Sequence, residues 1–260
     1  AVQMATMARL RREALAVTSS SKIDPELRGV FEQALADLWI AYQPLVGRDG
    51  SLYGHEALMR LKHPKVPHPG AMLEIAEQLD DLPTLGRTIR TRAASPVANA
   101  PESGALFVNL HPYDLNDPDL VSPGSPLAQI AERVVLEITE RKDLSNIQTL
   151  RQRIIQLREI GFRVAVDDLG AGYAGLTSFA LLEPDIVKID MSLVRDLDRS
   201  PVKQRLVRSI TNLCRDMGIV VVGEGVETKA ERDALLEFGV DLLQGYLLAK
   251  PGQPFPKINW

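Results

Sequence analysis

Cysteine is almost absent from this sequence, and so are long apolar runs and an excess of basic residues. Cys214 is the single cysteine among 260 residues, which excludes an internal disulfide and a cysteine-built metal site and favours a reducing, cytoplasmic setting. The formal net charge of −4 argues against a protein that coats polymeric nucleic acid through a broad basic surface. A small anionic ligand is still compatible with this charge, provided that cations or a few placed side chains receive it.

No apolar stretch approaches the roughly 20 residues that a helix needs to cross a bilayer, so no membrane contact is expected. The first residues, AVQMATMARLRRE, contain neither an uninterrupted apolar core nor a cleavage-site pattern, and a secretory signal is not expected either. The composition of 45% hydrophobic and 25% charged residues is typical of a globular protein with a sizeable core.

The N-terminal residues differ in pattern from the rest. Residues 1–17 place apolar side chains three or four positions apart, which predicts a helix, and residues 18–22 read as a flexible break. This helix is either a solvated leader or a connector from an upstream sensory domain, and the sequence leaves both open. We therefore divide the chain into a connector helix and linker at 1–22 and one domain at 23–260.

The domain begins with a predicted helix. Asp24-Pro25-Glu26 reads as an N-cap, a proline in the first turn and a first-turn acid, which predicts a helix to about Asp37.

Strand and helix patterns alternate through the domain. The later strands are continuous apolar runs, as expected when both faces of a parallel sheet are covered by helices. Only residues 47–50 separate the first two strands, so this pair forms a hairpin and one strand runs antiparallel to the rest. The pattern predicts an α/β fold, a modified (β/α)8 barrel with one antiparallel strand. The predicted strands are 38–46, 51–61, 105–110, 133–138, 162–167, 185–190, 219–224 and 240–244, and the predicted helices are about 70–80, 84–99, 145–160, 201–217 and 228–238.

Polar residues stand at the ends of the later strands, where an apolar barrel core would reject them. In a parallel barrel the carboxyl ends of the strands meet at one rim, so these side chains should gather in one place. They are Asn109, Glu137, Asp167, Asp168, Lys188, Asp190, Glu224 and Gln244. Taken singly, each is also explained as a helix cap, a turn residue or half of a structural ion pair, but capping does not easily explain their coincidence at strand ends.

Several carboxylates packed together stay ionised only beside cations. An oxygen-rich site without Cys or paired His suits Mg²⁺ or Mn²⁺. Asp167 and Asp168 precede Gly170 and Gly172, which let the chain turn so that both carboxylates point forward and bridge two ions. Two such ions form a clamp for phosphodiester hydrolysis, in which Lys188 orients the water or neutralises the phosphoryl oxygens.

Eight motifs, in order, are similar to those of the EAL domain family, phosphodiesterases that open cyclic di-GMP to linear pGpG. They are YQPLV at 42–46, EALMR at 56–60, FVNL at 107–110, LEITE at 136–140, VDDLGAGY at 166–173, VKID at 187–190, EGVET at 224–228 and QGYLLAKP at 244–251. The resemblance runs from about Tyr42 to Pro251. It implies a barrel with an antiparallel strand, cyclic di-GMP as the ligand, and a homodimer.

The resemblance also implies roles for individual residues. One metal ion is held by Glu56, Asn109, Glu137 and Asp167, and a second is shared by Asp167 and Asp168. Lys188 positions the attacking water, Glu224 acts as general base or organises that water, and Glu56 is catalytic through its metal. The residues that contact substrate are Gln43, Leu58, Arg60 and Gln244, and Glu140 steadies the loop after Asp168.

Three positions depart from the family pattern. Leu169 replaces an aromatic residue, Ala171 lacks a hydroxyl, and His111 replaces a small hydroxyl residue. Neither Leu169 nor Ala171 is a metal ligand in the resemblance, so these two departures bear on loop packing, dimer geometry and rate. Since every ligand position is filled, an active enzyme is favoured over a catalytically weak or inactive cyclic di-GMP receptor under an upstream sensor. A different phosphodiester substrate on the same scaffold is the third possibility.

Overall fold

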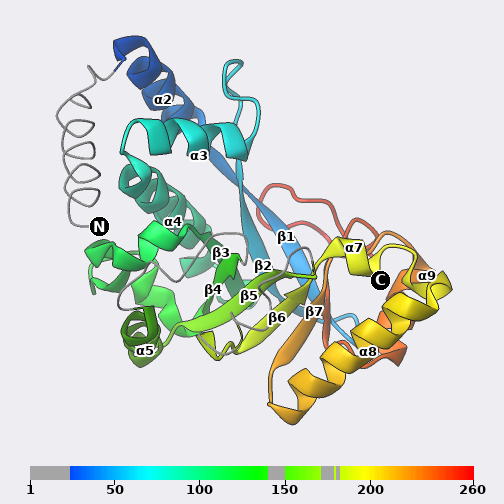
Figure 1. The fold of residues 1–260 in the computed structure, drawn as a ribbon. Coiled ribbons are helices and arrows are strands. Elements are labelled where there is room, and N and C mark those ends of the chain that lie inside the picture. The colour runs from blue at the N-terminus through cyan, green and yellow to red at the C-terminus, as the bar shows by residue number, and fades with distance from the viewer. Residues whose placement is uncertain (1–23, 140–149, 171–178, 180–181) are drawn as a thin grey trace, which may run out of the picture.

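Eight strands close into a barrel in chain order, and helices cover its outside (Figure 1). The computed structural model describes residues 24–139, 150–170, 179 and 182–260. The strands are β1 Trp39–Gly47, β2 Leu52–Arg60, β3 Ala105–Leu110, β4 Val134–Thr139, β5 Arg163–Leu169, β6 Ile186–Ile189, β7 Val220–Gly223 and β8 Leu242–Leu243. The predicted barrel is confirmed, and its last strand is shorter than the predicted 240–244.

The longer helices lie where the apolar spacing predicts them. They are α2 Pro25–Asp37, α3 Pro69–Gln78, α4 Leu82–Ala98, α5 Leu150–Ile160, α8 Pro201–Asp216 and α9 Lys229–Glu237. Short turns of helix that the sequence reading did not predict are η1 Pro101–Ser103, η2 Pro112–Asn116, η3 Pro118–Val121, η4 Ala128–Arg133, α7 Met191–Val194 and η6 Leu197–Arg199. No helix in the described part of the chain is long and apolar enough to cross a membrane. The predicted helix at 1–17 and the first residues of the one at 145–160 lie outside the described residues.

The first strand is the antiparallel one. β1 runs antiparallel to both of its neighbours, β2 and β8, whereas every other neighbouring pair is parallel. The hairpin between β1 and β2 closes through a tight turn in which Gly50 takes a φ of +83°, a conformation that favours glycine. Because β1 is reversed, its Gln43 lies opposite Glu56 of β2, close to the rim where the other strands end.

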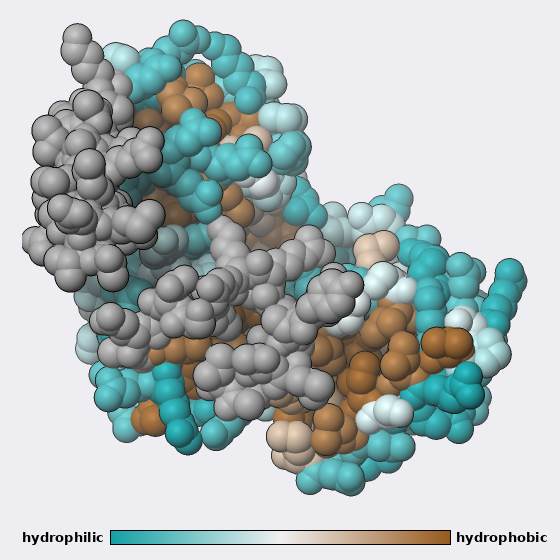
Figure 2. Space-filling model, in the orientation of Figure 1, coloured by the Kyte–Doolittle hydropathy of each residue, from teal (hydrophilic) through white to brown (hydrophobic). Residues whose placement is uncertain are grey.

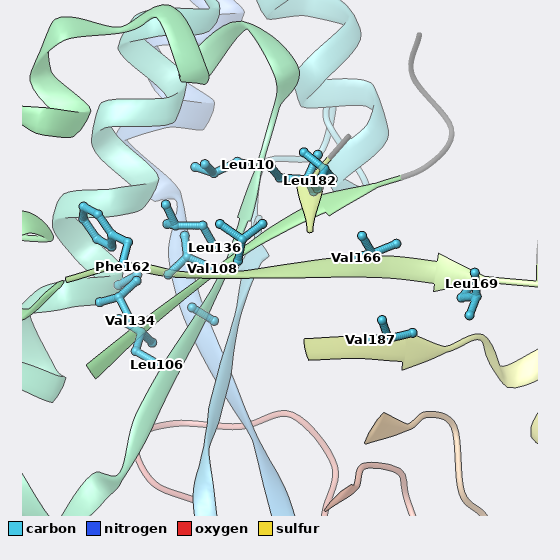
Figure 3. Close-up of a cluster of buried hydrophobic side chains, with 14 of the residues drawn as sticks. Leu106, Val108, Leu110, Val134, Leu136, Phe162, Val166, Leu169, Leu182 and Val187 are labelled. Carbon is cyan, nitrogen blue, oxygen red and sulfur yellow. The ribbon is translucent and has the colours of Figure 1, made fainter. Parts of the chain in front are cut away.

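Two apolar layers hold the barrel. Strand alternation sends every second residue inward, and these form a small inner cluster with Phe107, Val135 and Ile186 among its members. The residues between them point outward and pack against the helices. Figure 3 shows this outer layer, with Leu106, Val108, Leu110, Val134, Leu136, Val166 and Val187 labelled along the strands.

Candidate active site

The candidate site lies directly above the inner apolar cluster. Each of its strand-borne polar residues stands two positions after an inward-facing apolar residue, so the period-two alternation of a strand points it into the barrel mouth. The pairs are Phe107 and Asn109, Val135 and Glu137, Ala165 and Asp167, Ile186 and Lys188, Val222 and Glu224, and Leu242 and Gln244. The inner cluster is therefore the floor of the site.

Lys188 is the centre of the acidic cluster. Its Nζ lies 2.6 Å from Glu137 Oε1 and 2.7 Å from Glu224 Oε1. It also lies 3.4 Å from Glu56 Oε2 and 3.5 Å from Asp167 Oδ1. The Lys188 side chain is 1% exposed, so four carboxylates from different strands converge on one buried ammonium group. The predicted convergence of these side chains is observed.

Two amides hold Glu56 in this arrangement. Asn109 Nδ2 donates to Glu56 Oε1 at 2.8 Å, and Gln244 Nε2 donates to Glu56 Oε2 at 2.6 Å. Gln244 Nε2 also donates to Gln43 Oε1 at 3.2 Å, and Gln43 Nε2 donates to the Ala249 carbonyl at 3.0 Å. Both oxygens of Glu56 are thus fixed by donors from β3 and from the chain after β8.

The end of β5 carries a bulge that brings two adjacent acids to the same side. Pairing of β5 with β6 shifts register between Val166 and Leu169, and Asp168 takes a left-handed φ of +58°. The oxygens of Asp167, Asp168 and Glu224 lie within 4.8 Å of one another. The sequence reading assigned the turn to Gly170 and Gly172. Gly170 has a φ of +108°, but Asp168 itself makes the first left-handed step, and Gly172 lies outside the described residues.

Burial and mutual repulsion shift the pKa values of these acids. Burial and the neighbouring Glu56 raise the pKa of Glu137 well above its ordinary value despite Lys188. Burial raises the pKa of Glu224 to about 8, again against the pull of Lys188. Burial also acts on Glu56, but Lys188 and the amide hydrogen bonds outweigh it, and the pKa of Glu56 is lowered. Burial opposes the charge on Lys188, but the four acids raise its pKa well above the ordinary value.

These residues fit a divalent metal. All candidate ligands are oxygens, which Mg²⁺ and Mn²⁺ prefer. Glu137 is fully buried, and its Oε2 has no hydrogen-bond partner in the described part of the chain, so this oxygen is available to a cation. The tightest group of oxygens, from Asp167, Asp168 and Glu224, includes an acid that the sequence reading assigned to the base and not to the metal.

Two pockets meet at Leu58 beside this cluster. The acidic pocket, of about 310 Å³, is lined by Gln43, Glu56, Leu58, Asp168, Asp190, Met191, Glu224, Gly225, Glu227, Gln244, Gly245 and Tyr246. The apolar pocket, of about 280 Å³, lies between α3, α4 and the ends of β2 and β3, and is lined mainly by apolar residues, five of them leucines, with Arg60, Arg90, Asn109 and His111 among its polar members. Arg60 thus borders the apolar pocket, while Gln43 and Gln244 border the acidic one.

The capping explanation holds for Asp190 but not for Glu224. Asp190 caps α7 by accepting from Ser192 N at 2.9 Å, and no ion pair joins it to Lys188 among the described residues. The cap of α9 is a box formed by Thr228 and Glu231, and Glu224 takes no part in it. Glu224 is therefore left to the cluster.

Some predicted residues lie outside the described part of the chain, and some residues that line the pockets were not predicted. Glu140 lies outside the described residues, and so does Ala171. Met191 and Tyr246 line the acidic pocket and were not predicted, although each stands within two residues of a predicted rim residue. A rule that takes the residues just after each strand end would have found both. Arg90 of α4 had no motif to mark it.

The barrel and its acidic cluster define an α/β-barrel protein with a candidate metal centre. The family model of the EAL domain matches residues 30–251. The chain belongs to the EAL domain family.

Named relatives agree with this assignment. The chain is 34% identical over 221 residues to the Escherichia coli K12 protein named "Probable cyclic di-GMP phosphodiesterase PdeG", a match that covers 81% of this chain and 44% of PdeG. It is 30% identical over 262 residues to the cyclic di-GMP phosphodiesterase PdeF of the same strain, covering 96% of this chain and 35% of PdeF. The chain therefore spans less than half the length of these curated relatives.

Solved structures give the same fold. A Klebsiella pneumoniae BlrP1 complex with calcium and cyclic di-GMP matches with a TM-score of 0.77 at 33% identity, over 86% of this chain and 58% of BlrP1. The PaMucR phosphodiesterase in complex with cyclic di-GMP matches with a TM-score of 0.76 at 28% identity, over 88% of this chain and 98% of that one.

Proposed function

We propose that this chain is a metal-dependent phosphodiesterase that hydrolyses cyclic di-GMP to linear pGpG and so lowers a bacterial second messenger. The observation that carries the proposal is the set of four carboxylates around Lys188, beside two pockets that share Leu58. Glu56 and Glu224 of this cluster line the acidic pocket, and the apolar pocket adjoins it at Leu58, so a dinucleotide would place a phosphate at the acids and a base in the apolar pocket. The named relatives and the cyclic di-GMP complexes of similar proteins support this choice of substrate.

The ligands of the first ion are those that the family resemblance implies, and the oxygens of Asp167, Asp168 and Glu224 that lie together support the second site. One Mg²⁺ or Mn²⁺ ion is assigned to Glu56, Asn109, Glu137 and Asp167, and a second is assigned to Asp167 and Asp168 with Glu224 close by. When bound, such ions neutralise a phosphate and lower the pKa of a water to near neutrality. Manganese and calcium occur in the BlrP1 complexes, which supports a divalent site of this kind.

The chain's own residues supply the rest of the reaction. Glu224 accepts the proton of the attacking water, and Lys188 holds the Glu224 carboxylate 2.7 Å from its ammonium group. Arg60 offers its guanidinium to a substrate phosphate. Gln43 and Leu58 contact the dinucleotide, and Gln244 fixes Glu56 while lining the same pocket.

Incubation of the chain with cyclic di-GMP and Mg²⁺ or Mn²⁺, followed by chromatography of the nucleotides, tests the proposal. We expect linear pGpG, and we expect Glu56→Ala to abolish its formation by removing a metal ligand. Tight binding of cyclic di-GMP without pGpG would instead identify a non-catalytic receptor. A panel of other cyclic dinucleotides separates this substrate from other phosphodiesters.

Three expectations stay predictions beside the proposed reaction. They are the homodimer, the upstream sensory domain joined through a connector at 1–22, and the cytoplasmic setting. Residues 1–23 lie outside the described part of the chain.

A further inference from the structure

An arginine is buried between α4 and the short helical turns that follow β3. Arg90 of α4 is 2% exposed, and its Nη1 donates to Asp114 Oδ1 at 2.8 Å. Its Nη2 donates to Asp117 Oδ2 at 2.5 Å and lies 3.8 Å from Asp119 Oδ2. Arg87 on the same helix pairs with Asp117 at 2.7 Å. A buried guanidinium group is costly unless its charge is compensated, so the two arginines and the two buried aspartates balance one another here.

This network is connected to the end of β3. Asp114 Oδ2 accepts from His111 N at 3.0 Å, and Asp114 N donates to the His111 carbonyl at 2.8 Å. His111 stands two residues after Asn109, whose Nδ2 donates to Glu56 Oε1 at 2.8 Å. The Arg90 side chain is thus joined, through one carboxylate and one backbone N–H, to the strand end that carries Asn109.

The end of β3 depends on this support because one neighbouring strand leaves it early. Pairing of β2 with β3 ends at Ala57 and Val108, whereas β4 pairs with β3 up to Leu110. The apolar pocket lies between the separated ends of β2 and β3, and Arg90 and Asn109 both line it. On this side Asn109 has no strand partner among the described residues, and α4 packs against β3 and η2 instead (Figure 1).

We propose that Arg90 is a positioning residue: through Asp114 it holds the end of β3 and so places Asn109 at the acidic cluster. Its effect reaches the site through the backbone of η2 and not through its own charge. The inference rests on the proposed metal centre, because Asn109 is one of the ligands assigned to the first ion. It goes beyond that assignment by naming a residue of α4, outside every motif, on which the ligand depends.

A charge-balanced pair of substitutions removes this link without leaving a buried charge. Arg90→Met alone would leave the Asp114 carboxylate buried without its cation, so it is combined with Asp114→Asn. The asparagine oxygen can still accept from His111 N, and Arg87 still pairs with Asp117. This double variant therefore loses the connection between α4 and η2 but keeps the cap of η2.

Binding of Mn²⁺ alone, measured from the EPR signal of the free ion with no nucleotide present, tests the double variant. We expect the dissociation constant to rise about tenfold, the low end of the effect when a group that orients a metal ligand is removed. Figure 2 shows apolar surface over α8, so all titrations use one protein concentration to exclude effects of association.

The outcomes separate this inference from the proposed reaction. Unchanged Mn²⁺ affinity in a folded double variant overturns the positioning role, and so does an unsubstituted chain that binds no Mn²⁺. If the expected loss of Mn²⁺ affinity is observed but the unsubstituted chain forms no pGpG, the positioning role is supported and the proposed reaction is wrong.

The matched control lies at the opposite end of the barrel. Arg158 of α5 lies 3.4 Å from Asp185 Oδ2, which also accepts from Val164 N at 2.8 Å. This pair joins a helix to a backbone N–H near the start of β5, as the first pair does after the end of β3. Arg158→Met with Asp185→Asn should lower the melting temperature without changing Mn²⁺ affinity. Equal losses of Mn²⁺ affinity in the two double variants would indicate general instability and contradict the positioning role.

A double-mutant cycle with Asn109 tests the route of the effect. Asn109→Ala should weaken Mn²⁺ binding of the unsubstituted chain about tenfold, which is about 1.4 kcal/mol, because it removes one ligand. In the background of Arg90→Met and Asp114→Asn the same substitution should weaken it less than about threefold, since the ligand is already displaced. If the two effects multiply independently, Arg90 does not act through Asn109 and the proposal is overturned.

Discussion

A buried ammonium group surrounded by four carboxylates is an unusual residue environment, and Lys188 occupies it. Removing one partner of a buried ionic cluster is costly, because the remaining charges lose their compensation without regaining water. Lys188 therefore has two separable effects: it holds the acids together, and it neutralises charge beside the proposed reaction centre.

Replacing this lysine should separate the two effects. We expect Lys188→Met to destabilise the metal-free protein by about 3 kcal/mol and to lower kcat at least about a hundredfold. Added Mn²⁺ should recover most of the melting temperature, because a cation again lies among the acids, but it should not recover turnover. Thermal melts with and without Mn²⁺, together with pGpG formation, measure both quantities.

The matched control is Lys65→Met, because Lys65 is exposed and pairs only with exposed Glu26 among the described residues. It should leave turnover and melting temperature close to those of the unsubstituted chain. Turnover of Lys188→Met within tenfold of the unsubstituted chain would contradict the role of Lys188.

Arg60 is expected to act on the substrate and not on the metal. Its Nη1 donates to the Met59 carbonyl at 2.9 Å, and no ion pair joins it to the acidic cluster in the described residues. Arg60→Ala should therefore raise KM about tenfold to thirtyfold through loss of a phosphate contact, while Mn²⁺ affinity changes less than about twofold. Steady-state kinetics and a Mn²⁺ titration check the two values. Loss of Mn²⁺ binding would assign Arg60 to the metal centre.

Gly86 of α4 and Gly29 of α2 differ in whether the surrounding structure leaves room for a side chain. A Cβ at Gly86 of α4 would lie 2.1 Å from Asp114 Oδ1, whereas a Cβ at Gly29 of α2 meets nothing within 4 Å. Asp114 accepts from buried Arg90 at 2.8 Å and caps the turn after β3 by accepting from His111 N at 3.0 Å. The absence of a side chain at Gly86 thus allows α4 to pack against η2.

The same substitution should have opposite effects at these two positions. Gly86→Ala should destabilise the protein by about 1–3 kcal/mol, because the added methyl group displaces Asp114. Gly29→Ala should stabilise it by up to about 1 kcal/mol, since alanine has a higher helix propensity than glycine and its Cβ would meet no neighbour. Urea unfolding measures both. Equal changes in the free energy of unfolding for the two substitutions would show that Asp114 can move away without destabilising the protein.

Side-chain directions in regular strands follow from the sequence, but the conformation at the end of β5 could not be predicted from it. Once the strands are placed, the period of two residues gives the inward direction of Glu137 and Lys188, because successive side chains of a strand point to opposite faces. By the same rule Leu169 should face inward with Asp167, yet it packs in the outer apolar layer. The bulge and the left-handed Asp168 cause this change, and no local pattern marks a left-handed aspartate before it is seen.

At the scale of the whole molecule, the strand order makes the site predictable. Once the chain is a barrel of mostly parallel strands, residues as distant in sequence as Glu56 and Gln244 must share one rim. The network of Arg90 and Asp114 was not predictable, since it joins a helix to a short turn through side chains that belong to no motif. The residues of the apolar pocket depend on that tertiary packing in the same way.

The acidic cluster should also set how stability depends on pH. Glu137 and Glu224 have raised pKa values in the folded chain, with Glu224 at about 8, so the folded state keeps protons that the unfolded chain releases above its ordinary pKa near 4.5. Glu224 therefore lowers stability by up to about 1.4 kcal/mol per pH unit as the pH rises from about 5 to about 8, and Glu137 acts in the same direction. Glu56, with a lowered pKa, and Lys188, with a raised pKa, contribute stability that is constant over this interval.

The proposed divalent metal would bind the ionised acids and remove this penalty, so the rise in melting temperature caused by Mg²⁺ should grow between about pH 5.5 and about pH 8. The comparison of melts in EDTA and in excess Mg²⁺ at each pH cancels groups that point away from the acids, such as His55, which contacts Ser103 and Phe255 and whose pKa burial lowers. Glu224→Gln removes one of the two titrating acids and should flatten the increase. If the Mg²⁺-induced rise in melting temperature does not change with pH, these acids are already ionised without metal. The electrostatic reason for placing cations among them would then be removed.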